Sequence, residues 1–109
     1  MHKVVRDIEK YHMCPKFESA FELLGKRWTG LIIRTILNGQ HRFSDIEEAI
    51  PNMSSRMLTE RLKELDKEGI IVRKVYPETP VRIEYELTEK GLELENVMDE
   101  IQKWAEKWT

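Results

Sequence analysis

Apolar residues spaced three and four positions apart run through the first 69 residues and predict a series of amphipathic helices. A short helix is expected over residues 3–10. The next begins at Cys14-Pro15, because proline suits the first helical turn, and Gly25 ends it. Asn38-Gly39 closes a further helix, whose apolar stripe consists of Trp28, Leu31, Ile32 and Thr35.

Two more helices are separated by a short turn. Ser44 and Glu47 have the spacing of a capping box, which predicts a brief helix ending near Ile50. Pro51-Asn52 makes the turn, and Ser54 caps the longer helix that follows. The buried stripe of this longer helix is expected to be Leu58, Leu62 and Leu65, with Gly69 as its stop.

The apolar period then changes to the alternation of strands. Residues 70–76 and 81–87 are predicted strands, and the segment between them is too rich in proline to be one. Thr88 is placed to cap a last helix that runs to the C-terminus. One face of that helix carries Leu94, Val97, Met98, Ile101, Trp104, Ala105 and Trp108.

This order of elements predicts a winged helix-turn-helix. The fold class is α+β, mostly α, with a two-stranded β wing and terminal dimerisation helices. One domain over residues 1–109 is expected, with a DNA-binding core at about 14–88 and dimerisation helices at about 1–13 and 89–109.

Composition narrows the class of partner. The chain is 40% hydrophobic and 35% charged, which suits one small globular domain. Its formal net charge is −2, so the chain as a whole is not basic. The charges are segregated, however, with net +2 over residues 53–83 and net −5 over residues 84–109. Such segregation is expected when one face meets phosphate and another does not.

The helix after Ser54 is the candidate recognition helix, because a short helix, a turn and a longer helix present the last to the major groove. Its first turn offers backbone N–H groups and a dipole that favour phosphate. Arg56 is long enough to reach a guanine edge. The expected DNA contacts on this helix are Ser54, Ser55, Arg56, Thr59, Lys63 and Lys67. The alternative is an ordinary helix with a solvated charged face, which its four acidic residues favour.

The predicted hairpin adds a second basic segment, since Arg73, Lys74 and Arg82 flank its tip. Such a hairpin could follow the DNA backbone or enter the minor groove. The alternative is that these basic residues protect an exposed sheet edge from pairing.

The last helix favours a dimer, because its tryptophans lie where a small domain has little core left to cover them. The expected interface residues are Val97, Ile101, Trp104 and Trp108. The alternative is that this stripe folds back onto its own core.

Cys14 is the single cysteine, which excludes an internal disulfide and favours a reducing, cytoplasmic compartment. Helix N-termini favour the thiolate, so Cys14 is a candidate redox-sensing residue. The alternative is a small buried apolar side chain, the commoner fate of a lone cysteine. The N-terminus lacks the apolar segment of a signal peptide, and no apolar run reaches membrane-spanning length.

Enzyme chemistry finds little support in the sequence. His2, His12 and His41 are scattered and lack metal-ligand spacing. There is no glycine-rich phosphate loop and no nucleophile motif. We therefore expect no catalytic residue, metal site or cofactor.

The chain resembles the HxlR-type family of prokaryotic winged-helix regulators, which is related to the MarR-type regulators. The matching segments are Cys14-Pro15, LLGKRWT ending at Thr29, Arg42-Phe43-Ser44 after Gly39, MLTERLKELDKEGI ending at Ile70, Tyr76, and PVRIEYELTEKG ending at Gly91. The resemblance implies a homodimer on palindromic operators, with DNA contacts on the helix after Ser54 and on the wing around Arg82. Arg42 is a further expected DNA contact. Some members sense electrophiles or oxidants through the cysteine of this Cys-Pro pair, and others do not.

Together these patterns predict a cytoplasmic homodimeric regulator of transcription, a repressor that binds double-stranded DNA, with no membrane partner and an unknown small-molecule effector. The alternative is a winged-helix module that binds a partner protein, and a third reading makes thiol sensing its main role. Salt dependence separates DNA binding from the protein module, because phosphate contacts release counterions.

Overall fold

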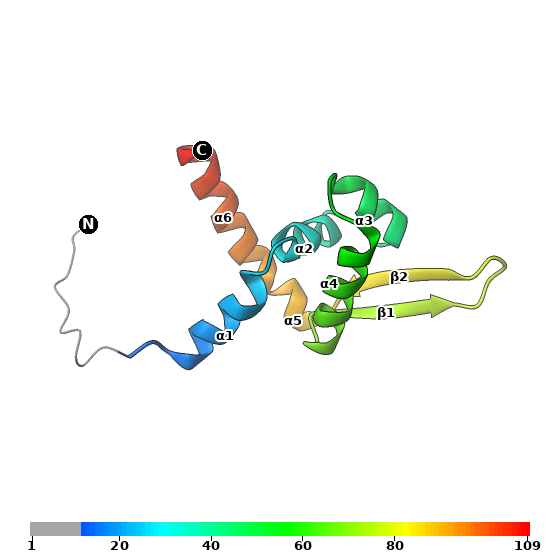
Figure 1. The fold of residues 1–109 in the computed structure, drawn as a ribbon, viewed down its shortest axis with the longest axis horizontal. Coiled ribbons are helices and arrows are strands. Elements are labelled where there is room, and N and C mark those ends of the chain that lie inside the picture. The colour runs from blue at the N-terminus through cyan, green and yellow to red at the C-terminus, as the bar shows by residue number, and fades with distance from the viewer. Residues whose placement is uncertain (1–11) are drawn as a thin grey trace.

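The structure is a computed structural model that describes residues 12–109 (Figure 1). The helix predicted over residues 3–10 lies outside the described residues. The elements in chain order are α1 (Pro15–Leu24), α2 (Thr29–Leu37), α3 (Phe43–Ala49), α4 (Ser55–Lys67), β1 (Ile71–Tyr76), β2 (Arg82–Leu87), α5 (Glu89–Leu92) and α6 (Leu94–Trp108).

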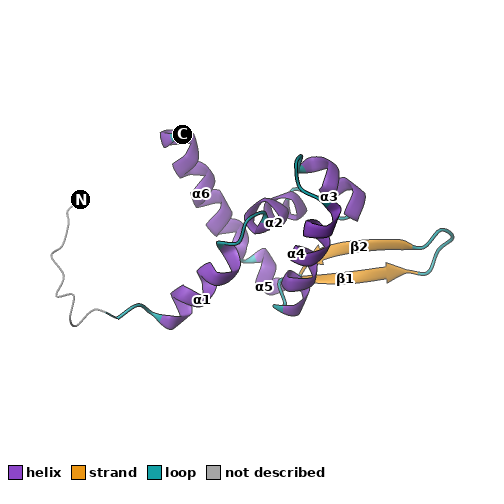
Figure 2. Ribbon diagram, in the orientation of Figure 1, coloured by secondary structure: helices purple, strands orange, loops and turns teal. Residues whose placement is uncertain are grey.

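The two strands form an antiparallel hairpin, the wing, which extends away from the helices (Figure 2). Ile71 at the base of β1 lies opposite Leu87, and the register continues to Tyr76 opposite Arg82. On its other side β2 forms an isolated bridge between Glu84 and Arg42. The wing is therefore joined by backbone pairing to the segment that leads into α3. α1 and α6 lie on the side of the molecule away from the wing (Figure 1).

The core fills the space between α2, α3, α4 and the base of the wing. As predicted, Leu58, Leu62 and Leu65 are buried along one face of α4. Ser54 caps α4 by accepting a hydrogen bond from the Met57 backbone N–H, and Gly69, with φ of +75°, follows its end. The core consists of Ile32, Ile33, Ile36, Ile46, Ile50, Met53, Leu58, Leu62, Leu65, Ile70, Ile71 and Met98.

The predicted stripe of α2 was wrong by one position. Trp28 precedes the helix in a left-handed conformation, with φ of 79°, and the helix begins at Thr29. Leu31 is 55% exposed rather than buried. Both stripes fit a 3.6-residue period, because this segment carries apolar residues on most of its circumference. The buried face consists of Thr29, Ile32, Ile33 and Ile36.

The capping box predicted at the start of α3 was also wrong. α3 begins at Phe43, Arg42 occupies the N-cap without a side-chain cap bond, and Ser44 lies within the helix. Backbone pairing of Arg42 with Glu84 keeps the preceding segment extended, and the helix starts two residues earlier than predicted. Glu47 has a different partner, the hydroxyl of Ser55 on α4.

The C-terminal helix was predicted as one piece, but it is two, α5 and α6, which meet at Glu93. Thr88 caps α5 as predicted, accepting from the Gly91 backbone N–H. A Cβ on Gly91 would lie 2.2 Å from the Ile70 carbonyl oxygen, so only glycine fits there. Lys90 Nζ donates to the Glu68 carbonyl at 2.7 Å. We call this close contact of α5 with the end of α4 and the base of the wing the α5 joint.

Among the described residues, no helix combines the length and the apolar character needed to cross a membrane. Within residues 12–109 no group of three or more His, Cys, Asp or Glu side chains is arranged to hold a metal ion.

Candidate nucleic-acid interface

α4 presents a polar face to solvent, opposite its buried leucines. The Arg56 side chain is 90% exposed, and its Nε lies 3.7 Å from the Glu60 carboxylate one turn along. A pair this exposed is weak, so Arg56 remains available to a partner. All six residues predicted to contact DNA on this helix are exposed: Ser54, Ser55, Arg56, Thr59, Lys63 and Lys67.

Two hydroxyls on this face already donate hydrogen bonds within the protein. Ser55 Oγ donates to the Glu47 carboxylate on α3, which ties the two helices of the helix-turn-helix together. Thr59 Oγ1 donates to the Ser55 carbonyl at 2.9 Å. The Ser55 hydroxyl therefore holds the angle between α3 and α4.

Sequence patterns missed a second support of α4, on the flank facing the turn between α1 and α2. Arg61 Nε donates to the Arg27 carbonyl at 2.9 Å, and Arg61 also pairs with Glu64 at 3.2 Å. Lys26 reaches the same Glu64 carboxylate at 3.3 Å. Arg61 lies three residues after Leu58, so it borders the buried stripe of α4. This spacing could have indicated from the sequence that Arg61 contacts the rest of the protein. These contacts fix α4 against the turn between α1 and α2.

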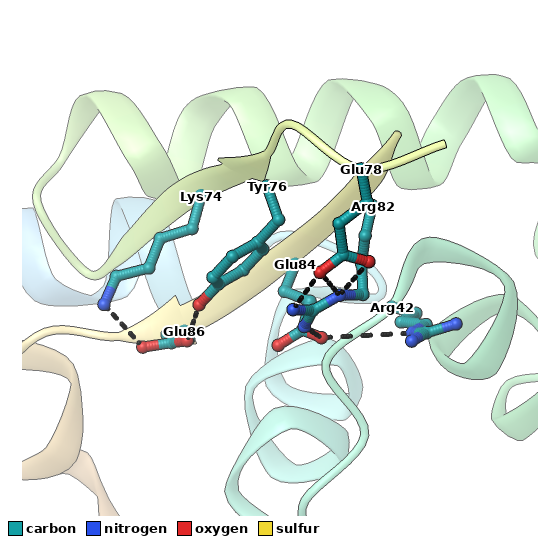
Figure 3. A network of polar contacts seen from close by, with 7 residues as sticks. All are labelled: Arg42, Lys74, Tyr76, Glu78, Arg82, Glu84 and Glu86. Carbon is teal, nitrogen blue, oxygen red and sulfur yellow. Dashed lines mark hydrogen bonds and ion pairs between the residues drawn. The ribbon is translucent and has the colours of Figure 1, made fainter. Parts of the chain in front are cut away.

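The face of the wing that carries Tyr76 holds a network of charges, drawn in Figure 3. Arg82 pairs with Glu78 at 2.8 Å, donates to Glu84 and stacks over the Tyr76 ring at 3.9 Å. Glu84 also lies 3.9 Å from Arg42 Nε. Hydrogen bonds from Arg82 lower the pKa of the Glu78 carboxyl, and those to Glu78 and then Glu84 raise the pKa of Arg82. Arg82 is thus a cation already neutralised by two carboxylates.

Nearer the base of the wing, a second pair lies on the same face. Lys74 Nζ is 3.0 Å from Glu86, and the Tyr76 hydroxyl donates to Glu86 at 3.4 Å. The hydrogen bond between Lys74 and Glu86 raises the pKa of Lys74 and lowers that of Glu86. Arg73 is exposed on the other face, opposite Tyr85. The basic residues of the wing are therefore divided between its two faces.

The outer stripe of α6 is exposed. Leu94 and Met98 pack against the core, whereas Trp104 is 62% and Trp108 66% exposed. A groove of about 590 Å³ runs along the molecular surface between α1, α2 and α6. The exposed large apolar residues around it are Phe17, Phe21, Leu31, Val97 and Ile101. The sequence left two roles open for this stripe, packing on the core or forming an interface. Its first residues pack on the core, and its C-terminal residues are exposed.

Cys14 is exposed at the N-cap of α1, directly before Pro15. Its carbonyl accepts the first intrahelical bond, from the Glu18 N–H at 3.0 Å. The alternative of a buried cysteine was therefore wrong, because the thiol is open to solvent.

A capped helix after a short turn, flanked by a two-stranded wing, defines a winged helix-turn-helix protein. The chain belongs to the HxlR-like helix-turn-helix family, which matches residues 23–109. The family resemblance and the fold class predicted from sequence are thereby confirmed. Members of this family are helix-turn-helix regulators of transcription, and this chain is one of them.

Two similar proteins come from Bacillus subtilis (strain 168). The HTH-type transcriptional regulator YvaP is 58% identical over 96 residues, which cover 88% of this chain and 89% of YvaP. The regulator YodB is 56% identical over 96 residues, covering 88% and 86%.

Solved structures share the fold. The reduced form of YodB has a TM-score of 0.78 at 56% identity, covering 89% of this chain and 95% of that one. The redox regulator HypR in its oxidised form has a TM-score of 0.81 at 34% identity, covering 88% and 98%.

Proposed function

We propose that this chain is a cytoplasmic homodimeric repressor that reads a palindromic DNA duplex with two copies of α4. The observation that carries the proposal is the exposed face of α4, where Arg56, Lys63 and Lys67 follow a capped N-terminus. Arg56 reads a base edge, and the two lysines contact phosphates. Two such helices related by a dimer axis would reach successive major grooves about 34 Å apart.

The uncovered stripe of α6 supports the homodimer. Trp104 and Trp108 are large apolar side chains of the kind that anchor interfaces. The segment of α5 and α6, residues 89–109, carries six acidic and three basic residues, and this negative charge favours a position away from the phosphates. A second copy packed on this stripe would leave both α4 helices free.

The experiment is a salt series of binding to two duplexes of about 30 base pairs, three helical turns. One is selected by the purified protein from a random library, and the other is unselected. We expect tighter binding to the selected duplex and a steep loss of affinity with salt on both. Failure of a folded, reduced protein to bind either duplex at low salt would favour the protein-interaction module instead.

A second property follows from Cys14: we infer that oxidants change DNA binding through this thiol. Cys14 is exposed at a helix start, and the similar protein YodB has been solved in reduced, diamide-treated and quinone-bound forms. With one cysteine in the chain, a disulfide must join two copies or a copy and a small thiol. Two thiols that form one disulfide pass two electrons and two protons to diamide.

The test compares wild type with Cys14→Ser before and after diamide. We expect diamide to alter binding of the wild type to the selected duplex, a thiol reductant to reverse the change, and the variant to stay unaffected. A Cys14→Ser protein that still responds to diamide contradicts the inference.

A further inference from the structure

One carboxylate, that of Glu84, contacts both the wing and the segment that enters the helix-turn-helix. It accepts a hydrogen bond from Arg82 on the wing and lies 3.9 Å from Arg42 Nε (Figure 3). Glu84 lies mid-strand, and its side chain is only 16% exposed. It therefore occupies the point at which wing and helix-turn-helix meet.

The backbone brings the two arginines to this carboxylate. Arg42 and Glu84 are partners in an antiparallel bridge, and the Tyr85 N–H donates to the His41 carbonyl at 2.8 Å. Bridge partners direct their side chains to the same face of a sheet, so Arg42 and Glu84 meet there. Arg82 lies two residues from Glu84 on the same strand and shares that face.

Charge shows why this contact matters for a surface that meets DNA. Arg82, Glu78 and Glu84 together carry net −1, which by itself would repel phosphate. Arg42 brings the group to zero, and its side chain is 59% exposed. It borders a cleft of about 460 Å³ between the wing tip and α3, also lined by Ser44 and Thr79. Arg42 is thus the cation of this group that remains open to a phosphate.

We propose that Glu84 is a positioning residue for sequence selectivity, which fixes the wing and Arg42 relative to α4 without touching DNA. The proposal rests on the DNA-binding function proposed above. Phosphate contacts set the register of a protein on its duplex, so a displaced Arg42 misaligns Arg56 with its base. Loss of Glu84 lowers the preference for the selected duplex while overall attraction to DNA persists.

Glu86 provides the matched control, because it lies two residues along the same strand and on the same face. It pairs with Lys74, and within residues 12–109 it forms no ion pair with Arg42 or Arg82. Glu84→Gln and Glu86→Gln remove the same charge at nearly the same place. Glu84→Asp keeps the charge but shortens the side chain by one methylene, which separates geometry from charge.

The measurement is the ratio of affinities for the selected and unselected duplexes, with thermal unfolding as a check that each variant is folded at the assay temperature. We expect Glu84→Gln and Glu84→Asp to lower this ratio about tenfold, the effect of one misplaced base contact. Glu86→Gln should leave the ratio unchanged. Both glutamine variants should bind the unselected duplex more tightly than wild type, and Glu84→Asp should bind it equally.

A ratio in Glu84→Asp and Glu84→Gln equal to that of the wild type overturns the positioning role while leaving the proposed function intact. An equal fall in Glu86→Gln also overturns it, because the effect would then follow charge rather than the arginine contacts. A wild-type protein that prefers no duplex overturns both proposals.

Discussion

Ser55 on α4 donates its hydroxyl hydrogen to the carboxylate of Glu47 on α3, and this bond joins the two helices of the helix-turn-helix. The side chain was predicted to contact DNA, yet its donor is used within the protein. A donor engaged in this way holds a helix at a fixed angle, and an ionised acceptor makes such a bond stronger than a neutral one.

Ser55→Ala should therefore lower the free energy of unfolding by about 1 kcal/mol, the contribution of one hydrogen bond. Urea unfolding measures this directly. Ser44→Ala is the control, because Ser44 lies exposed within α3, whose N-cap lacks a side-chain cap bond. Its effect should stay within about 0.5 kcal/mol. A larger loss of unfolding free energy in Ser44→Ala than in Ser55→Ala would indicate that Ser44 caps α3 in solution, as the sequence predicted.

Arg56→Ala should weaken binding to the selected duplex by about 1–3 kcal/mol and binding to the unselected duplex much less, since a bidentate base contact carries discrimination. Titrations of both duplexes at one salt concentration give the two values. Equal losses on the two duplexes would contradict a base-reading role for Arg56.

Lys63→Ala should weaken binding to both duplexes to a similar extent and flatten the dependence of affinity on salt by about one unit of slope, because a phosphate contact releases about one counterion. The measurement is affinity at four or more salt concentrations. An unchanged slope would exclude a phosphate contact at Lys63.

Ile101→Glu should dissociate the proposed dimer, with a dissociation constant raised about 100-fold, because it places a charge in the apolar stripe of α6. Sedimentation equilibrium measures the change. Asn96→Glu adds the same charge at an exposed position of α6 outside that stripe and should leave the dimer intact. A monomeric wild type would rule the dimer out.

The ion pairs of the wing predict a pH window. The pKa of Glu78 is lowered by Arg82, and that of Glu86 by Lys74, from an ordinary value of 4.5. A carboxyl whose pKa is lowered in the folded protein stabilises the fold fully at pH values above its ordinary pKa, and this stabilisation is lost as the pH falls through the lowered pKa. Lys74, whose pKa is raised, stabilises the fold fully below its ordinary pKa of 10.5, and this stabilisation is lost as the pH rises through the raised pKa.

The side-chain carboxyl chemical shifts of Glu78 and Glu86 should therefore stay constant at neutral pH and change only as the pH falls below 4.5, and the Lys74 Nζ shift should change only as the pH rises above 10.5. Glu86→Gln should move the Lys74 transition to lower pH and leave the Glu78 transition unchanged. A transition of either carboxyl above pH 4.5 in the wild type would show that its ion pair does not form in solution.

The helices and strands were predictable where one local signal dominates. Ser54 caps α4 and Gly69 follows its end, since a side-chain acceptor and a positive φ are properties of single residues. The alternation of apolar residues likewise predicted both strands, while the register that places Ile71 opposite Leu87 came from the structure. The same holds for the face of α4, where charged and apolar residues separate cleanly.

Long-range contacts explain what the sequence could not predict. The start of α3 depends on pairing of Arg42 with Glu84, 42 residues away along the chain. The buried face of α2 depends on which neighbours pack against it, and Leu31 and Ile33 fit either face by composition. Arg82 was expected to attract DNA electrostatically, but Glu78 and Glu84, four and two residues away in sequence, both pair with it once the hairpin forms. The start of α3 and the buried face of α2 are thus set by partners far apart in sequence, whereas the pairing of Arg82 is set by the hairpin.

The α5 joint has a mechanical consequence. The Ile70 carbonyl lies where a side chain on Gly91 would be. The base of the wing and the start of the C-terminal helices are therefore packed in direct contact and cannot move independently. In the proposed dimer, contacts between α6 helices near Trp104 would therefore move each winged-helix body as one rigid unit. The separation of the two α4 helices, and with it the spacing of the half-sites, would then depend on residues that do not contact DNA.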